Sequence, residues 1–348
     1  EYNEFAFWTG ESSLDSLEHV HSLNRMLRQA IPLGNESFTV HTRIGVAFFP
    51  VDGKNRQELF KAADLALNSL AENGDNRVAR YSRKFSDLFI RRMELSRDFW
   101  KSLDAGDYSV RYQPQVYSGD RTLYGAEALV RWHHPSKGNV SPGEFIPLAE
   151  QHGFITELDE WVLTQSCIDA AAWTLPLGLS VNVSGAQLRN PHRLDRAIIA
   201  ALEQSGLPAS RLTLEITESS LLEEKEDASS LLRKLKKLGI GIALDDFGTG
   251  YSSLSYIQDL PLDKLKIDQS FIRRLENDSG SEKIVGTIIA LAHGLGMKTV
   301  SEGVELPGQA DILGNMGNDY LQGYLYGKPV TAMEFAEAIR LQELQHRR

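Results

Sequence analysis

The chain has 348 residues, of which 42% are hydrophobic and 24% are charged, a composition typical of a globular protein and not of a disordered or fibrous one. Its formal net charge of −10 argues against a broad binding surface for duplex nucleic acid. No apolar run in the sequence is long enough to span a bilayer, and no signal peptide is visible. The one cysteine, Cys167, cannot form an intrachain disulfide. We therefore expect a reducing, cytoplasmic setting and no membrane segment in this chain.

The first 85 residues have the pattern of an α+β region. Apolar spacing predicts, in chain order, a strand over 1–8, a helix over 13–31, a strand over 38–50 and a helix over 55–74 that is closed by Gly74. A charged segment follows, with few turn residues and apolar residues near the helical period, so we expect a semi-rigid helical connector over 86–104.

From about residue 108 the pattern changes to strand followed by helix, repeated. The predicted strands are 108–113, 122–131, 178–184, 211–216, 239–246, 263–268, 297–302 and 319–324. The predicted helices are 155–173, 192–205, 219–238, 281–295, 308–316 and 331–344. This alternation fits a (β/α)₈ barrel best, and a doubly wound open sheet is the alternative. In either fold, active sites collect at the carboxyl ends of the strands.

Nearly every predicted strand of this region ends in a polar side chain that can bind a metal ion. In chain order these side chains are Glu127, Asn182, Glu215, Glu218, Asp245, Asp246, Asp268, Glu302, Glu305 and Gln322. One such residue alone means little, because strand ends are near solvent and often polar. Together they would point into one mouth, where several uncompensated carboxylates could not all stay ionised.

Hard divalent cations resolve that conflict, and an all-oxygen ligand set suits Mg²⁺ or Mn²⁺ better than Zn²⁺. The adjacent Asp245 and Asp246 could serve two metal ions, the usual apparatus for phosphodiester hydrolysis. Arg131 is then a candidate phosphate clamp. Lys266 could orient the attacking water or stabilise transition-state charge, and a simple ion pair with Asp268 or Asp246 is compatible with that role.

Other chemistries find less support in the sequence. The glycine-containing loop after Asp246 is not a nucleotide-binding P-loop, because no Gly-Lys-Ser/Thr follows. No histidine or cysteine set has zinc-binding spacing, and no nucleophile-elbow serine is present.

The motifs "EALVRW", "NVS", "EITE", "DDFGTGYSSL", "LKID", "SEGVE" and "QGYLYGKP" resemble, in order and approximate spacing, those of the EAL-domain phosphodiesterases. The resemblance runs from about residue 90 to the C-terminus. It implies a modified TIM barrel, with one strand antiparallel to the rest, that cleaves cyclic di-GMP to linear pGpG. The expected cofactors are two divalent cations, Mg²⁺ or Mn²⁺, and the expected assembly is a homodimer through this domain.

The resemblance also implies roles for individual residues, and the sequence departs from the family at none of them. One metal ion would be held by Glu127, Asn182, Glu215 and Asp245, and the second by Asp245, Asp246 and Asp268. Lys266 and Glu302 would orient and activate the water, with Glu302 also near the metal ions and Glu127 counted as catalytic. The substrate-binding positions would be Gln113, Leu129, Arg131, Asp268, Glu305 and Gln322. A regulatory loop coupled to the dimer interface would comprise Phe247, Gly248, Thr249, Gly250, Tyr251, Ser252 and Ser253, anchored by Glu218.

The first 85 residues resemble the C-terminal half of a GGDEF (diguanylate cyclase) domain, and residues 45–82 carry the match. Where that family has Gly-Gly-Asp-Glu-Phe, this chain reads Glu1-Tyr2-Asn3-Glu4-Phe5. The two glycines allow a tight hairpin and close approach of a base, which Glu1 and Tyr2 would obstruct. We therefore expect no cyclase activity. The expected organisation is a degenerate GGDEF-like part over 1–85, a connector over 86–104 and an EAL domain over 105–348.

Two readings remain beside the metal-dependent phosphodiesterase. One is a catalytically silent receptor for cyclic di-GMP, which would need a missing ligand or base. The other is an unrelated two-metal barrel hydrolase, for which the motif register would be coincidence.

Overall fold

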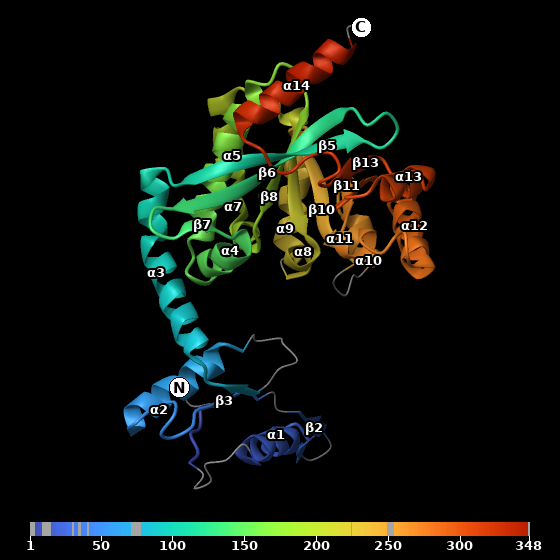
Figure 1. Cartoon of the computed structure of the whole chain (residues 1–348). Coiled ribbons are helices and arrows are strands. Elements are labelled where there is room, and N and C mark those ends of the chain that lie inside the picture. The colour runs from blue at the N-terminus through green and yellow to red at the C-terminus, as the bar shows by residue number, and fades with distance from the viewer. Residues whose placement is uncertain are drawn as a thin grey trace. The chain divides into compact units, whose positions relative to one another are not determined.

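The structure, a computed structural model, describes residues 4–8, 15–29, 31–33, 36–39, 42–70, 78–223, 225–248 and 254–346. It divides into two compact units, Glu1–Arg97 and Asp98–Arg348 (Figure 1). Each unit is described by itself.

In the N-terminal unit two short sheets accompany two helices. Helix α1 (Asp15–Leu27) precedes the antiparallel pair β1 (Ile31–Leu33) and β2 (Glu36–Phe38). Strand β3 (Ile44–Val46) pairs in parallel with β4 (Val78–Arg80), and α2 (Arg56–Asn68) packs against β3. The approach of α2 is close, since a Cβ on Gly45 would lie 2.0 Å from the Ala63 carbonyl oxygen. Helix α3 (Arg83–Ala105), which belongs to this unit as far as Arg97, confirms that the segment 86–104 is helical.

Four expectations for this unit need correction. The helix expected over 13–31 ends at Leu27, and Ile31 instead begins β1 and pairs with Phe38. Residues 4–8 form no strand, because no described residue pairs with their backbone, and residues 1–3 lie outside the described part. The strand expected over 38–50 is only β3, because Phe48 and Asp52 exchange hydrogen bonds and turn the chain. The helix expected to end at Gly74 ends at Asn68 in a right-handed cap at Ser69, and Gly74 lies outside the described residues.

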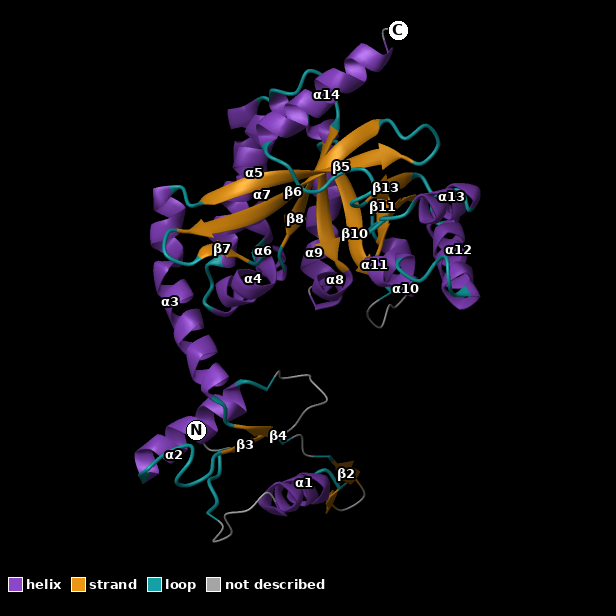
Figure 2. Cartoon of the chain, in the orientation of Figure 1, coloured by secondary structure: helices purple, strands orange, loops and turns teal. Residues whose placement is uncertain are grey.

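The second unit is built on eight strands that close into a barrel (Figure 2). They are β5 (Tyr108–Tyr117), β6 (Leu123–His134), β8 (Gly178–Val183), β9 (Leu212–Thr217), β10 (Gly241–Phe247), β11 (Lys264–Ile267), β12 (Lys298–Ser301) and β13 (Tyr320–Gln322). Each matches a predicted strand. Strand β5 closes the barrel by pairing antiparallel with both β6 and β13, whereas all other neighbours in the barrel are parallel. The open-sheet alternative is therefore wrong, and the expected single antiparallel strand is found.

A further short strand, β7 (Gly138–Val140), extends β6 as a hairpin. Helices surround the strands, and all six predicted ones are present: α5 (Ile155–Ala171), α7 (Pro191–Ser205), α12 (Ser279–Gly294), α13 (Pro307–Asn315), α14 (Ala332–His346), and the 219–238 pattern as α8 (Glu218–Glu223) and α9 (Lys225–Lys237). The elements not predicted are α4 (Pro142–Gln151), α6 (Gly185–Leu188), α10 (Leu254–Asp259), α11 (Gln269–Ile272) and the 3₁₀ turn Ala209–Arg211. Helices α6, α10, α11 and the 3₁₀ turn are too short to show a helical period.

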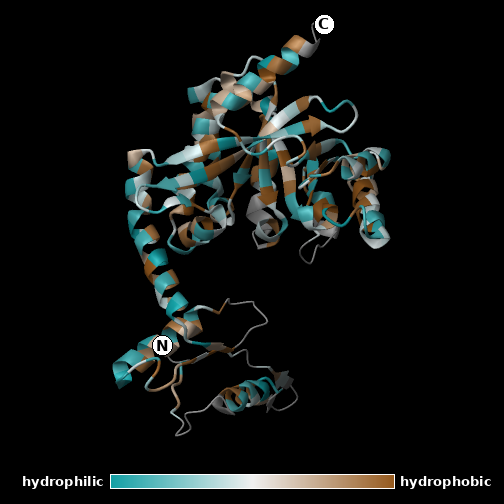
Figure 3. Cartoon of the chain, in the orientation of Figure 1, coloured by the Kyte–Doolittle hydropathy of each residue, from teal (hydrophilic) through white to brown (hydrophobic). Residues whose placement is uncertain are grey.

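Hydrophobic and polar residues both occur along the barrel strands (Figure 3). Leu179, Val181, Leu212, Leu214 and Ile242 are all fully buried, as expected for residues that pack between sheet and helices. Among the residues that alternate with them are Thr213 and Glu215, which are also buried and polar. The barrel interior is therefore partly polar, and Glu215, further along β9 than Thr213, belongs to the site described next. Within the described residues, no helix combines the length and the apolar character needed to cross a bilayer.

Candidate active site

The barrel strands carry the predicted polar residues to one end of the barrel. Strand pairing places Gln113 of β5 beside Glu127 of β6, and Asn182 of β8 beside Glu215 of β9. Asp245 lies near the end of β10. Lys266 lies on β11, Glu302 follows β12 and Gln322 ends β13. Residues from neighbouring strands thus converge, as the sequence predicts.

Lys266 lies at the centre of this convergence. Its side chain is 1% exposed, and its ammonium group contacts four carboxylates. The Nζ atom lies 2.5 Å from Glu215 Oε2, 2.6 Å from Glu302 Oε1, 3.1 Å from Asp245 Oδ2 and 3.4 Å from Glu127 Oε2. Four strands are therefore tied to β11 through one cation.

One ammonium group does not neutralise four buried carboxylates. Burial alone would lower the pKa of Lys266, but the surrounding carboxylates, Asp245 foremost, raise its pKa well above the ordinary value, so it stays charged. Burial, with the charge of Glu127, raises the pKa of Glu215 to about 8. Burial likewise raises the pKa of Glu302 well above its ordinary value. The cluster is short of positive charge, which is the electrostatic condition for binding a further cation.

Glu127 is held in its ionised form by its neighbours. Burial opposes this, but Lys266 and hydrogen bonds from Gln322 and Asn182 hold the pKa of Glu127 below its ordinary value. Asn182 Nδ2 donates to Glu127 Oε1 at 2.8 Å, and Gln322 Nε2 donates to Oε2 at 2.6 Å. Both oxygens of this carboxylate are therefore oriented by amide donors.

The two adjacent aspartates share one side of β10 through an unusual backbone. Asp246 has φ +55°, in the left-handed region, and the pairing of β10 with β11 shifts register between Leu244 and Phe247. The Asp246 amide donates to Asp245 Oδ1 at 2.9 Å. As a result, oxygens of Asp245, Asp246 and Glu302 all lie within 4.8 Å of one another and could hold a metal ion. A non-glycine residue in this conformation costs about 1–3 kcal/mol, and such strain is concentrated at functional sites.

Asp268 lies at the start of α11, where its carboxylate accepts a hydrogen bond from the Ser270 amide at 2.9 Å. It is not one of the three residues whose oxygens meet, but its charge, after burial and the charge of Asp245, contributes to raising the pKa of Asp246. Asp268 therefore lies beside the cluster, with part of its hydrogen-bonding capacity used in capping a helix.

Among the expected substrate-binding residues, Gln322 contacts the cluster directly through its bond to Glu127. Gln113 Oε1 accepts from Gln322 Nε2 at 3.2 Å. Arg131 is half-buried, and burial lowers its pKa without removing its charge. Leu129 lies two residues after Glu127 and two before Arg131 on β6, and so lies on their face of the strand. Glu305 is exposed, and its backbone amide donates to Gln309 Oε1 at 2.9 Å.

The anchor of the expected regulatory loop is where the sequence predicts it. Glu218 is 3% exposed, and its Oε2 accepts from the Gly248 amide at 3.3 Å. Gly248 has φ +94°, and a Cβ there would lie 3.0 Å from the Phe271 ring. Phe247 ends β10. The remaining residues of the predicted loop, Thr249, Gly250, Tyr251, Ser252 and Ser253, lie outside the described residues.

One residue of the cluster was missed by sequence reasoning. Gln115 is 2% exposed and donates through Nε2 to Gln322 Oε1 at 2.8 Å. The signal that could have found it is its position two residues after Gln113, which places both on one face of β5.

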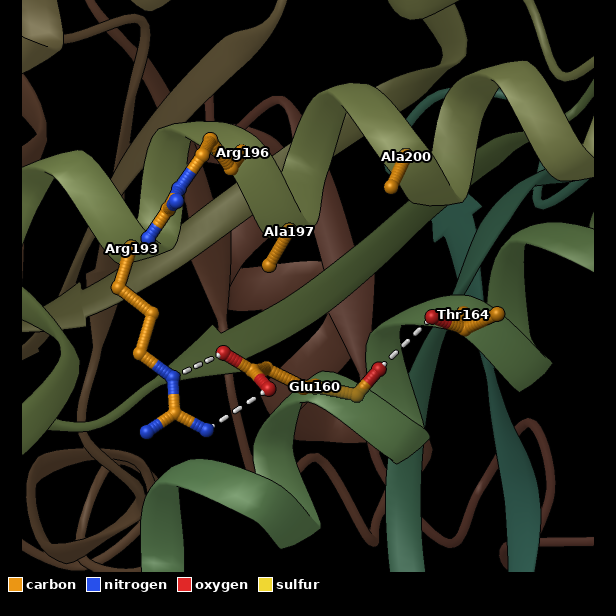
Figure 4. A pocket seen from close by; sticks show the side chains of 6 residues that line it. All are labelled: Glu160, Thr164, Arg193, Arg196, Ala197 and Ala200. Atoms are coloured by element: carbon orange, nitrogen blue, oxygen red, sulfur yellow. Dashed lines mark hydrogen bonds and ion pairs between the residues drawn. The ribbon is translucent and has the colours of Figure 1, made fainter.

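A groove on the outside of the barrel has no part in this cluster. It lies between α5 and α7, encloses about 380 Å³ and is lined by Glu160, Thr164, Arg193, Arg196, Ala197 and Ala200 (Figure 4). The Arg193 guanidinium donates hydrogen bonds to Glu160 at 2.6 and 3.0 Å and to Glu157 at 3.1 Å. These ion pairs join two helices, so the groove is a packing feature.

Comparison with known proteins agrees with this geometry. The family model described as "EAL domain" matches residues 95–329. The bifunctional diguanylate cyclase/cyclic di-GMP phosphodiesterase MucR of Pseudomonas aeruginosa is 34% identical over 329 residues, covering 93% of this chain and 48% of MucR. The cyclic di-GMP phosphodiesterase NbdA of the same organism is 36% identical over 322 residues, covering 91% of this chain and 41% of NbdA. The chain thus spans less than half the length of these relatives.

A solved structure described as "PaMucR Phosphodiesterase, c-di-GMP complex" superposes with a TM-score of 0.67 at 39% identity, covering 70% of this chain and 99% of that one. The EAL enzyme Bd1971, solved with cAMP and cyclic di-GMP bound, superposes with a TM-score of 0.68 at 30% identity, covering 72% of this chain and 69% of that one. The match of the family model over more than half of the chain, together with the closed barrel and its carboxylate cluster, shows that the chain belongs to the EAL domain family.

Proposed function

We propose that the protein hydrolyses cyclic di-GMP to linear pGpG with two divalent cations, Mg²⁺ or Mn²⁺, and so lowers this second messenger in bacterial signalling. The observation that carries the proposal is the buried cluster in which four carboxylates surround Lys266. Relatives named as cyclic di-GMP phosphodiesterases, and a related phosphodiesterase solved with cyclic di-GMP, support the choice of substrate.

The residues present fit a pair of divalent cations. All candidate ligands offer oxygen, and the cluster carries an excess of buried negative charge, as hard cations require. Glu127, Asn182, Glu215 and Asp245 would hold one ion. Asp245, Asp246 and Asp268 would hold the second, with Glu302 beside them. Ions bound there would lower the pKa of a water molecule and offset the charge of the phosphate.

The chain's own residues would supply the rest of the chemistry. Glu302 pairs with Lys266 at 2.6 Å and lies beside Asp245 and Asp246. Its ionised form, favoured by cations bound there, would accept a proton from the attacking water. Lys266 remains charged and would orient that water and stabilise the negative charge that develops on the phosphate. Arg131 would bind a phosphate, and Gln113 would bind the substrate beside it. Leu129, Glu305 and Gln322 would complete the substrate-binding wall.

The proposal extends to the organisation of the chain. A degenerate GGDEF-like part over 1–85, a connector over 86–104 and an EAL domain over 105–348 would form a homodimer through the EAL domain, in the cytoplasm. The Glu218–Gly248 contact would anchor the loop that links the site to the dimer interface.

The test is to incubate the protein with cyclic di-GMP and Mg²⁺ or Mn²⁺ and to separate the products by chromatography. We expect linear pGpG, and we expect it to disappear with EDTA and in Glu127→Ala. Tight binding of cyclic di-GMP without turnover under either metal ion would overturn the proposal in favour of a silent receptor.

A further inference from the structure

Four side chains in the barrel form a directed chain of hydrogen bonds that begins at Gln115. Its Nε2 donates to Gln322 Oε1 at 2.8 Å, and Gln322 Nε2 donates to Glu127 Oε2 at 2.6 Å and to Gln113 Oε1 at 3.2 Å. We propose that Gln115 is a positioning residue, which fixes the Gln322 amide and through it the carboxylate of Glu127. This inference rests on the proposed function, in which Glu127 is a metal ligand.

The direction of the chain follows from the chemistry of its end. An ionised carboxylate can only accept hydrogen bonds, so Gln322 must turn its NH₂ group towards Glu127. The carbonyl oxygen of Gln322 then faces the opposite way and needs a donor. Gln115 supplies that donor, and without it the buried oxygen would be left unsatisfied, at a cost that favours turning the amide.

The strands hold these groups in register. Gln115 lies directly opposite Gln322 in the antiparallel pairing of β5 with β13, and Gln113 lies opposite Glu127 in the pairing of β5 with β6. Gln115 and Gln322 are 2% and 4% exposed, so water offers them little alternative. The antiparallel strand β5 therefore supplies one residue at the cluster and a second that orients it.

The consequence concerns the shape of the metal site. Glu127 accepts from Asn182 on one oxygen and from Gln322 on the other. Loss of Gln115 frees the Gln322 amide to rotate and leaves Glu127 Oε2 with only the longer contact from Lys266 Nζ at 3.4 Å. Groups that orient a metal ligand in this way contribute strongly to metal affinity.

The test is Gln115→Met in the full chain, because methionine keeps the length of the side chain but removes its donor. Without substrate, we expect the apparent Kd for Mn²⁺, measured by electron paramagnetic resonance, to rise about 10- to 100-fold. With cyclic di-GMP, we expect kcat to fall by a similar factor while KM changes by less than about threefold. A crystal structure of the metal-free variant should show the Gln322 amide turned away from Glu127.

The matched control is Gln165→Met, which removes the bond from Gln165 Nε2 to Asp169 Oδ1 on α5. It should leave the Mn²⁺ affinity unchanged. The inference is overturned if Gln322 keeps its bond to Glu127 in Gln115→Met and Mn²⁺ affinity stays within about twofold of the parent. The crystal structure and the Mn²⁺ affinity can both be measured without turnover. If the parent protein binds cyclic di-GMP but does not hydrolyse it, only the proposed function is overturned. If Gln115→Met does not fold, Gln115→Leu serves for the same measurements.

Discussion

At the scale of single residues, the sequence predicted which side chains meet but not what holds them together. The sequence placed several carboxylates together at one end of the barrel, because each lies near the end of a strand: Asp245, Asp246, Glu302 and Glu127. The left-handed φ of Asp246 and the four contacts of Lys266 depend on local backbone geometry and on strand register, which residue types do not specify. For the same reason Gln115 was missed.

Lys266→Met should damage both catalysis and stability. Removing the ammonium leaves four buried carboxylates without their cation, so in EDTA we expect the free energy of unfolding to fall by roughly 3–5 kcal/mol. With substrate and Mg²⁺ present, kcat should fall about 100- to 1,000-fold. Urea denaturation and steady-state kinetics measure the two effects.

Lys264→Met is the matched control, because Lys264 is also buried on β11 but bonds to Thr213 and stacks on Tyr124. Its kcat should stay within about tenfold of the parent, since the transition-state charge is assigned to Lys266 alone. Equal losses in both variants would contradict the role given to Lys266.

Asp159→Asn should change how stability depends on pH. Burial raises the pKa of Asp159 to about 7, although hydrogen bonds from Ser184 lower it. The folded protein therefore keeps a proton that the unfolded chain loses near pH 4, and stability declines as pH rises from about 4 to about 7. At pH 8 the parent buries an ionised Asp159, whereas asparagine cannot ionise. The variant should therefore be more stable than the parent at pH 8 by roughly 2 kcal/mol, allowing for solvent at this partly exposed side chain.

Thermal unfolding between pH 5 and pH 8 tests this. Asp104→Asn, at an exposed position near the end of α3, should keep the pH dependence of the parent. A parent and an Asp159→Asn protein with parallel stability profiles would count against the proton assigned to Asp159.

At the scale of elements, all eight barrel strands and six helical patterns could be predicted. Strands buried on both faces are recognised as apolar runs, and long helices by apolar residues at the helical period. Short elements such as α6 and α11 could not, since four residues show no period. The N-terminal strands were predicted less well. A strand forms only where its backbone pairs with another strand, and the sequence of a segment does not show which strand that is. Segment 4–8 is the example.

Gly125→Ala should separate β6 from β8. A Cβ on Gly125 would lie 2.4 Å from the carbonyl oxygen of its paired residue, Gly178, so backbone must move. We expect the free energy of unfolding to fall by about 1–3 kcal/mol, as for other overpacked cores. Gly119→Ala, where nothing lies within 4 Å, should change it by less than about 0.5 kcal/mol. Urea denaturation of both variants checks the difference, and equal stabilities would refute it.

At the scale of the whole molecule, the second unit closes on itself. Its eight barrel strands and their surrounding helices belong to Asp98–Arg348, and the core needs no strand from the first unit. The sequence predicted a change from α+β to repeated strand and helix, but the structure divides at Arg97, inside the segment 86–104 that was expected to be a connector.

A fragment of residues 83–348, which starts at the first residue of α3, should therefore fold and keep kcat within about tenfold of the full chain, as expected for a unit with its own core. Circular dichroism and the pGpG assay measure the two properties. A folded fragment with kcat reduced more than about 100-fold would mean that residues 1–82 take part in catalysis.

The reversed direction of β5 decides where the chain enters the barrel. Tyr108, the first residue of β5, pairs with Trp132, which lies beyond Glu127 and Arg131 on β6. In an all-parallel barrel the first strand would begin at the far end and run towards the catalytic groups. Here the chain enters from α3 at the end of the barrel where the carboxylate cluster lies, and Gln113 follows the first residue of β5 by five positions. The point where the chain enters the barrel therefore lies at the same end as the carboxylate cluster.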